Sequence, residues 1–169
     1  WETAANFKNA SGTSMACPHV AGGLALLMDY KGSWKPQSLK ALLVNSSLTG
    51  SPYPSSPDNN WGWGGMDLGQ AYTAAGQPDS ARVHYERYLD TPYFYRTWND
   101  GLWLPLVYRD LAALLEEEGE TRAAAEYYKK LVNLWQEADP ELQPQVRAAK
   151  AALERLGSGL ARPAGPSGE

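Results

Sequence analysis

The sequence is poor in cysteine, in basic charge and in long apolar runs, and each shortage excludes a class of protein. Cys17 is the one cysteine among 169 residues, so the chain forms no internal disulfide. No segment reaches the ~18 consecutive apolar residues of a membrane-spanning helix, and the run from Val20 to Met28 is interpreted as a buried helix. The net charge is −4, without the basic excess of a nucleic-acid-binding surface. We therefore predict no membrane span and no nucleic-acid partner.

Two further absences concern processing and cofactors. The chain begins with Trp1 instead of Met and carries no recognisable signal peptide, so we expect it to be a piece of a longer protein. Cys17 has no second cysteine with which to bind a metal or form a redox pair, so we assign it a packing role. We predict neither a metal site nor a cofactor.

Composition shifts along the chain and divides it into three regions. Residues 1–66 are rich in Gly, Ser, Pro and Asn, with two apolar helical stretches. Residues 67–156 are rich in Ala, Leu, Glu and Tyr with a helical period throughout. Residues 157–169 have almost no side chains that could form a core, so they are predicted to be a disordered tail. The fold class is therefore mainly α.

The stretch "NASGTSMACPHVAGG" sets Gly12-Thr13-Ser14 directly before the apolar run. Glycine and small hydroxyl side chains weaken a helix, so a plain core helix would not begin this way. Ser14 is predicted to open a helix that runs to about Tyr30, with Pro18 in the first turn, where N–H groups lack partners in the helix. A second helix is expected within "SWKPQSLKALLVNSS", with Pro36 near its first position, and a loop over 49–60.

This stretch, followed by "WGWGGMDLGQA", resembles the C-terminal portion of subtilisin-like serine peptidases over residues 1 to about 71. The resemblance implies an incomplete piece of an α/β domain and a serine endopeptidase that acts on protein or peptide substrates. It assigns Ser14 as the nucleophile, with Thr13 and Met15 supporting the active site. It also implies secretion or a place in the cell envelope.

The chemistry of a helix start agrees with this resemblance. A serine hydroxyl is a weak nucleophile and requires an adjacent base and donors for the oxyanion. The backbone N–H of Ser14 at a helix N-terminus is a suitable donor. In this family the catalytic Asp and His precede Ser along the chain, so we expect both upstream of Trp1 and predict that this chain alone is inactive. His19 is interpreted as structural, and His84 as a surface or groove histidine; neither is expected to act as the base. The alternative is that Gly-Thr-Ser only caps a buried helix.

The second region resembles tetratricopeptide repeats. "LGQAYTAAGQPDSARVHYERYLDTP" and "LAALLEEEGETRAAAEYYKKLVNLW" place small, aromatic and glycine residues at corresponding positions. Inner helices are expected over 67–75 and about 104–118, with partner helices over 78–89 and 121–137. A third helical stretch after Asp139 is expected to cap the stack. A generic helical bundle is the alternative.

The repeats are separated by an aromatic insertion, "TPYFYRTWNDGLWLP". Its aromatic side chains either cover the exposed end of a short stack or line a peptide-binding groove, and we favour the cover.

Two functions remain open. The first is a subtilisin-like serine endopeptidase fragment with a protein-interaction repeat. The second is a non-catalytic tetratricopeptide interaction module that carries a peptidase remnant.

Overall fold

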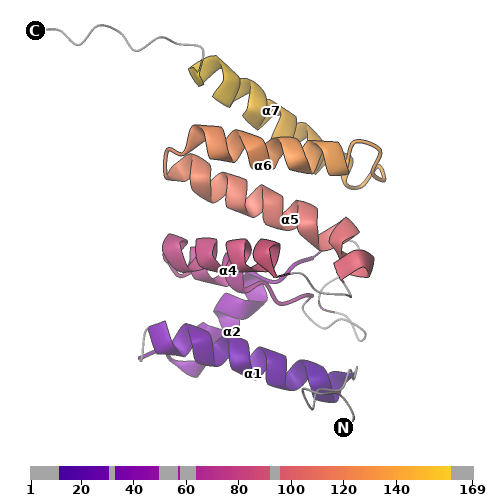
Figure 1. The fold of residues 1–169 in the computed structure, drawn as a ribbon. Helices are drawn as coiled ribbons and strands as arrows, with labels where there is room; N and C mark the ends of the chain where they lie inside the picture. The colour runs from indigo at the N-terminus through magenta and orange to yellow at the C-terminus, as the bar shows by residue number, and fades with distance from the viewer. Residues whose placement is uncertain (1–11, 31–32, 50–56, 58–63, 92–95, 161–169) are drawn as a thin grey trace, which may run out of the picture. The chain divides into compact units, whose positions relative to one another are not determined.

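The structure is a computed structural model that describes residues 12–30, 33–49, 57, 64–91 and 96–160, with the side chains of 30, 96–99, 102 and 158–160 left undescribed. These residues form seven α-helices and one isolated β-bridge, which confirms the predicted mainly α class (Figure 1). The chain divides into two compact units, residues 1–77 and 78–169, and each is described by itself.

Unit 1 contains helices α1 (Thr13–Tyr30), α2 (Pro36–Asn45) and α3 (Leu68–Ala74). Pro36 occupies the first turn of α2, where its missing N–H has no partner in any helix. Asp67 caps α3, because its carboxylate accepts a hydrogen bond of 2.9 Å from the backbone N–H of Gln70. All three helices lie where the sequence predicts them.

A tight backbone crossing explains two of the glycines in the "WGWGG" stretch. Leu48 and Gly65 form an antiparallel bridge, with N···O distances of 2.8 and 3.1 Å. Gly64 has a φ of +107°, and a Cβ there would collide with the backbone oxygen of Leu48. Only glycine satisfies both conditions, so this crossing fixes the approach of the chain to α3.

The expected burial of the apolar run in α1 is wrong. Leu27 is 2% exposed, but Val20, Leu26 and Met28 are 40%, 47% and 47% exposed. Gly23 is the position where α1 packs closely, because a Cβ there would lie 2.8 Å from the sulfur of Met66. An all-round apolar helix needs neighbours on every side, and the described part of the chain supplies no sheet to cover it.

Unit 2 contains helices α4 (Pro78–Asp90), α5 (Arg96–Glu117), α6 (Thr121–Leu134) and α7 (Gln143–Leu160). Consecutive helices pack against each other along the chain, α4 on α5, α5 on α6 and α6 on α7 (Figure 1). Small side chains at the contacts allow close approach of the helices. The buried hydrophobic residues of this unit are Ala81, Tyr85, Leu111, Ala112, Leu114, Leu115, Ala124, Ala125, Tyr128, Leu131, Trp135, Val146, Ala149, Ala152 and Leu156.

Helix α5 begins at Arg96, eight residues before the predicted start at about 104, so the second half of the aromatic insertion is helical. Gly101 and Pro105 disfavour a helix, and Pro105 cannot donate to the carbonyl of Gly101 four residues earlier. The indole N–H of Trp135 donates to that carbonyl instead, at 3.0 Å. Trp135 comes from the end of α6, so this compensation is tertiary and is invisible in the local sequence.

The two segments assigned to repeats have matching turns. Gly76 and Gly119 both have positive φ, +74° and +82°, which favours glycine. After each glycine the next N–H returns to the carbonyl five residues earlier, at 2.9 Å for Gln77 and 2.8 Å for Glu120. The same helix-ending motif therefore occurs at Gly76 and Gly119, the corresponding glycines of the two segments.

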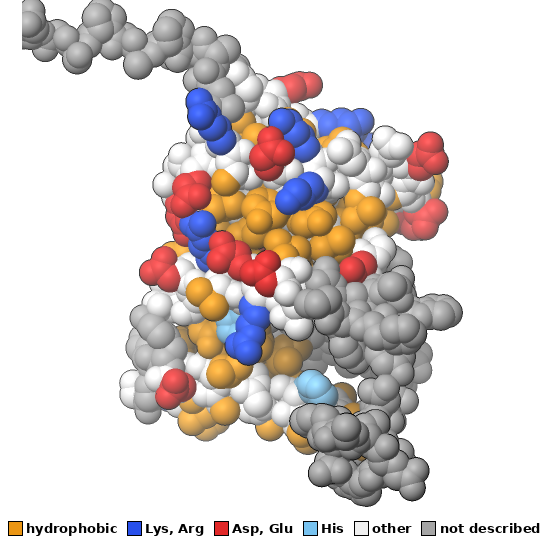
Figure 2. Space-filling model, in the orientation of Figure 1, with side chains coloured by type: hydrophobic (Ala, Val, Ile, Leu, Met, Phe, Trp, Pro, Cys, Tyr) orange, Lys and Arg blue, Asp and Glu red, His pale blue; other side chains and the backbone are white. Residues whose placement is uncertain are grey.

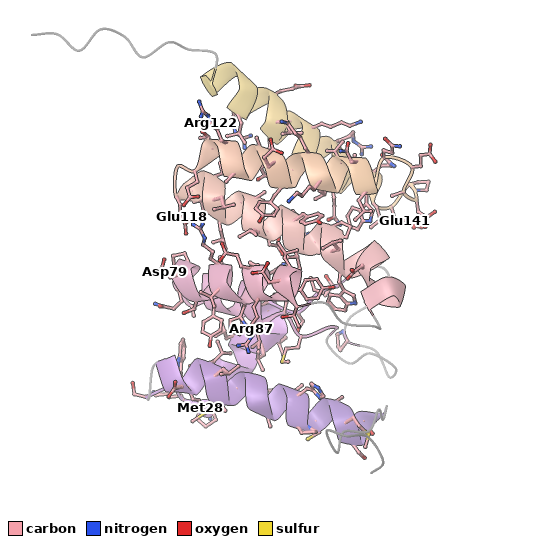
Figure 3. The ribbon with its side chains drawn as sticks, in the orientation of Figure 1. Met28, Asp79, Arg87, Glu118, Arg122 and Glu141 are labelled. Atoms are coloured by element: carbon pink, nitrogen blue, oxygen red, sulfur yellow. The ribbon has the colours of Figure 1, made fainter. Side chains whose placement is uncertain are left out.

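Ion pairs connect helices of unit 2 to each other. Arg82 on α4 reaches Glu118 at 2.7 Å and Glu120 at 2.8 Å, around the turn between α5 and α6, and also pairs with Glu86. In Figure 3, Asp79, Glu118 and Arg122 mark this end of unit 2, where α5 ends and α6 begins. These carboxylates raise the pKa of Arg82, although solvent screening keeps such exposed pairs weak.

Some expectations fall outside the described residues. These are most of the loop over 49–60, the tryptophans of "WGWGG", the side chain of Trp98 and the tail beyond Leu160. Helix α7 includes the first four residues of the expected tail, 157–160. Trp103 is half-buried within α5, and the choice between cover and groove stays a prediction.

Candidate active site

Ser14 lies in the exposed first turn of α1, two residues after Gly12. The backbone conformation of Gly12 is unusual. Gly12 has a φ of +131°, which other residues rarely adopt, and its carbonyl accepts from Met15 and Ala16 at 3.0 Å. The chain therefore turns sharply at Gly12, immediately before α1 begins. Thr13, Ser14 and Met15 all lie on the exposed first turn of the helix.

The backbone at this helix start has the polarity that an oxyanion requires. The hydrogen bonds to Gly12 begin with the N–H of Met15, so the N–H groups of Thr13 and Ser14 have no acceptor within α1. These groups and the positive end of the helix dipole attract negative charge. The arrangement is chemically suited to stabilise an oxyanion beside the Ser14 hydroxyl.

Pro18 lies one turn further along α1 than the sequence interpretation placed it. The N–H of Ala16 already bonds within the helix, so Pro18 is in the second turn and lies inside the helix. Its ring leaves the carbonyl of Ser14 without the usual i+4 donor. The proline therefore alters the backbone of Ser14 itself, which a first-turn proline would not do.

Neither histidine of the chain is placed as a base for Ser14. The Nδ1 atom of His19 lies 2.6 Å from the carbonyl oxygen of Met15, so this ring is held against its own helix. His84 belongs to α4 in unit 2, where burial and then the charge of Arg87 lower its pKa. Among the described residues, no carboxylate or imidazole hydrogen-bonds to the hydroxyl of Ser14.

Cys17 is exposed on α1, so the predicted packing role does not hold in this structure. Within the described residues no three His, Cys, Asp or Glu side chains gather as metal ligands. No described helix is long and apolar enough to cross a membrane.

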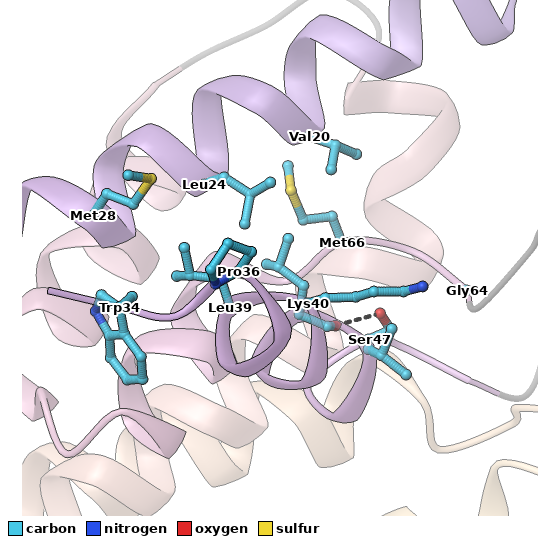
Figure 4. A pocket seen from close by; sticks show the side chains of 12 residues that line it. Val20, Leu24, Met28, Trp34, Pro36, Leu39, Lys40, Ser47, Gly64 and Met66 are labelled. Carbon is cyan, nitrogen blue, oxygen red and sulfur yellow. Dashed lines mark hydrogen bonds between the residues drawn. The ribbon is translucent and has the colours of Figure 1, made fainter.

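An apolar groove in unit 1 went unrecognised in the sequence. It has a volume of about 640 Å³ and lies between α1, α2 and the strand-like segment around Gly64 (Figure 4). Val20, Leu24 and Met28 line one wall, and their spacing of four residues on one helix face was the available signal. Leu39 and Met66 contribute to the other side of the groove.

Helices α1 and α3 of unit 1 are close enough for a charge on one to affect a group on the other, as Asp29 and Tyr72 show. Burial raises the pKa of the Tyr72 hydroxyl, and the charge of Asp29 raises it further. The hydroxyl of Tyr72 therefore stays protonated and neutral over the ordinary pH range.

Comparison with known proteins finds a family similarity in the first part of the chain. Residues 2–64 match the model of the subtilase family, peptidase S8. This match lies within unit 1. The family is one of serine-type peptidases, and the match includes the whole stretch from Gly12 to Tyr30.

Curated relatives match short stretches of the chain. A subtilisin-like protease of Arabidopsis thaliana is 44% identical over 39 residues, which are 23% of this chain and 5% of the relative. Alkaline serine exoprotease A of Vibrio alginolyticus is 48% identical over 44 residues, 26% of this chain and 8% of the relative. Minor extracellular protease Vpr of Bacillus subtilis is 36% identical over 53 residues, 28% of this chain and 7% of the relative.

The chain therefore spans less than a tenth of the length of these relatives. No solved structure matches the chain significantly.

Proposed function

We propose that residues 1–66 are the nucleophile-bearing C-terminal part of a subtilisin-like serine endopeptidase domain, and that Ser14 is its nucleophile. The observation that carries this proposal is the exposed Ser14 on a helix start whose first N–H groups have no acceptor in the helix. The subtilase match over residues 2–64 supports it independently.

In this proposal Ser14 attacks the carbonyl carbon of a peptide bond in a protein substrate. The C–N bond breaks as the acyl group passes to Oγ, and the amine leaves with the proton that the base took from the hydroxyl. The N–H of Ser14 donates to the oxyanion that forms, while Thr13 and Met15 shape the surrounding surface. The base that takes the hydroxyl proton comes from the catalytic histidine of the complete domain, with its aspartate partner. The chain as given is therefore inactive by itself.

The location and the second region complete the proposal. One relative is named an extracellular protease, and we place the complete protein outside the cell or in the cell envelope. Residues 67–156 form a tetratricopeptide-like segment that binds a protein partner, supported by the matched turns at Gly76 and Gly119.

A fluorophosphonate probe tests the chemistry directly. The chain as given is expected to show no labelling, and a longer protein with the upstream Asp and His is expected to be labelled at Ser14. In that longer protein Ser14→Ala should lower kcat about 10⁶-fold, the loss known for the nucleophile of subtilisin itself. Ser38→Ala, at an exposed serine of α2, is the matched control and should leave turnover unchanged.

Two results would contradict the proposal. Labelling of the chain as given that Ser14→Ala removes would show that a base is already present. Full turnover of the folded Ser14→Ala variant in the longer protein would remove Ser14 from the mechanism.

The second candidate function is a non-catalytic interaction module that carries a peptidase remnant. Helix α1 is poorly buried, whereas the helices of unit 2 are well packed, and this difference favours the second candidate. A longer coding sequence without an upstream Asp and His would decide for this candidate.

A further inference from the structure

Unit 2 carries an aromatic pair that the proposed peptidase chemistry does not use. The rings of Tyr108 on α5 and Tyr127 on α6 lie 5.9 Å apart between centroids, tilted by 36°. The ammonium of Lys130 lies over both rings, 4.5 Å from the centroid of Tyr127 and 5.6 Å from that of Tyr108. Figure 2 shows hydrophobic side chains gathered over α5 and α6, with charged side chains along the edge of this area. We call Tyr108, Tyr127 and Lys130 the tyrosine–lysine surface.

This surface already holds a cation. An ammonium within about 6 Å of an aromatic ring is attracted by the negative face of the ring. Lys130 is exposed and belongs to the same helix as Tyr127, so it reaches the rings at little entropic cost. An exposed contact of this kind is weak, and another cation can replace it.

The neighbouring charge on α4 favours cations as well. Glu86 and Asp90 lie close enough to raise the pKa of the Tyr127 hydroxyl, in addition to the larger effect of burial, while Arg82 lowers it. Arg82 is itself paired with Glu86, Glu118 and Glu120. Of the three charged side chains of α4 that act on Tyr127, two are carboxylates and one is a guanidinium, so α4 presents a net negative charge to this ring.

We propose that the tyrosine–lysine surface, with the carboxylates of Glu86 and Asp90, is a docking site for a basic segment of a partner protein. Lys130 occupies the site in the free chain, and an arginine or lysine of the partner displaces it. Arginine is the preferred side chain, because its planar guanidinium stacks on an aromatic face while its N–H groups bond to a carboxylate. Complementary charge is the basis for choosing this partner chemistry.

The inference rests on the proposed protein-binding role of the helices after Pro78 and names the partner chemistry. The test titrates the chain with a blocked Gly-Ser peptide that carries two arginines, and follows backbone amide signals by NMR. Matched peptides with two lysines or two glutamates are the comparison. The arginine peptide is expected to bind most tightly and to shift the signals of Tyr127 and Lys130, and added salt is expected to weaken it.

Variants separate the contributions of Lys130, the ring of Tyr127 and the carboxylate of Asp90. Lys130→Gln removes the competing cation and should tighten arginine-peptide binding about two- to fivefold, the gain expected from one exposed cation–π contact. Lys129→Gln is the matched control, because Lys129 is exposed beside it and pairs with Glu126. Tyr127→Leu should weaken binding by about the same factor, and Asp90→Asn, at an exposed position, should weaken it without affecting folding.

The outcomes distinguish the site from the broader proposal. Binding of the glutamate peptide as tight as that of the arginine peptide, or weaker binding by Lys130→Gln, overturns the site. Shifts confined to another face of unit 2 overturn the site but leave its protein-binding role. Self-association that Tyr127→Leu abolishes assigns the surface to a second copy and also overturns the inference.

Discussion

The two units bury their apolar side chains to very different degrees. In unit 2 most of the hydrophobic side chains between helices are buried, and Leu111 and Leu131 are 0% exposed. In unit 1 the most apolar helix of the chain, α1, leaves Leu26 and Met28 each 47% exposed. Both units are helical, so secondary structure does not explain the contrast.

The difference lies in where each helix finds its partner. The helices of unit 2 pack against the next helix along the chain, so each short segment completes its neighbour's core. Helix α1 is apolar on nearly every face and requires several neighbours that are remote in sequence. A segment that depends on remote elements is poorly packed when only its local neighbours are present.

The sharpest way to test this contrast is amide hydrogen exchange across the chain. We expect the amides of α5 and α6 to exchange on the order of 10³-fold more slowly than those of α1, because opening energies range from near zero to the global free energy of unfolding. Exchange read by mass spectrometry or NMR gives the ratio directly. Equal, strong protection of α1 and α6 would contradict the comparison and show that unit 1 is independently stable.

Truncation of one core leucine in each unit tests the same contrast energetically. Leu115→Ala in α5, where the side chain is 1% exposed, should lower the free energy of unfolding of unit 2 by about 2–5 kcal/mol. Leu27→Ala in α1, 2% exposed, should leave that transition unchanged because it belongs to the other unit. Denaturant unfolding followed by circular dichroism measures both.

Leu134→Ala on α6 is the control, because it removes the same apolar volume from a side chain that is 47% exposed and not part of the core. A shift for Leu27→Ala as large as that for Leu115→Ala would mean that the two units unfold as one.

The sequence predicted local features well and tertiary features poorly. Pro36 near the first position of α2 could be predicted because that preference depends only on a few adjacent residues. The start of α5 could not be predicted from the local sequence. A helix through Gly101 and Pro105 depends on the indole of Trp135, which is 30 or more residues away.

The candidate site divides in the same way. The motif around Ser14 predicted a helix that Ser14 opens and that ends at about Tyr30, and α1 spans Thr13–Tyr30. The position of Pro18 in the second turn was missed, because it depends on which residue makes the first helical hydrogen bond. The cation held over Tyr108 and Tyr127 was also missed, since it needs two helices to be brought together.

The hydrogen bond from the indole of Trp135 to the carbonyl of Gly101 tests how much a contact between two helices contributes to the stability of unit 2. Trp135→Phe should lower the free energy of unfolding by about 1–3 kcal/mol, because it leaves the freed carbonyl without a donor. In a Pro105→Ala background the new N–H takes that carbonyl, so the same substitution should have a smaller effect. The loss of ring volume is common to both backgrounds and cancels in the double-mutant cycle. Equal effects in both backgrounds would show that the indole contributes only packing.

The smallest expected effect is a loss of stability of unit 2 at alkaline pH through Tyr128. Burial, followed by the nearby charge of Glu116, raises the pKa of the Tyr128 hydroxyl from 10.0 to about 12. Because the folded-state pKa is the higher one, this contribution is fully present below pH 10 and is lost as the pH rises from about 10 to 12. Each pH unit in that window should lower the free energy of unfolding by at most about 1.4 kcal/mol.

Urea unfolding of the chain and of Tyr128→Phe at a series of alkaline pH values isolates this group. The phenylalanine variant cannot ionise, so the difference between the two curves should be constant below pH 10 and shrink above it. The hydroxyl of Tyr128 also donates to Glu116 at 3.2 Å, and Glu116 accepts from Arg155 on α7. Ionisation at Tyr128 therefore acts where α5, α6 and α7 meet. A difference that stays constant through pH 12 would show that Tyr128 ionises equally easily in the folded and unfolded chain.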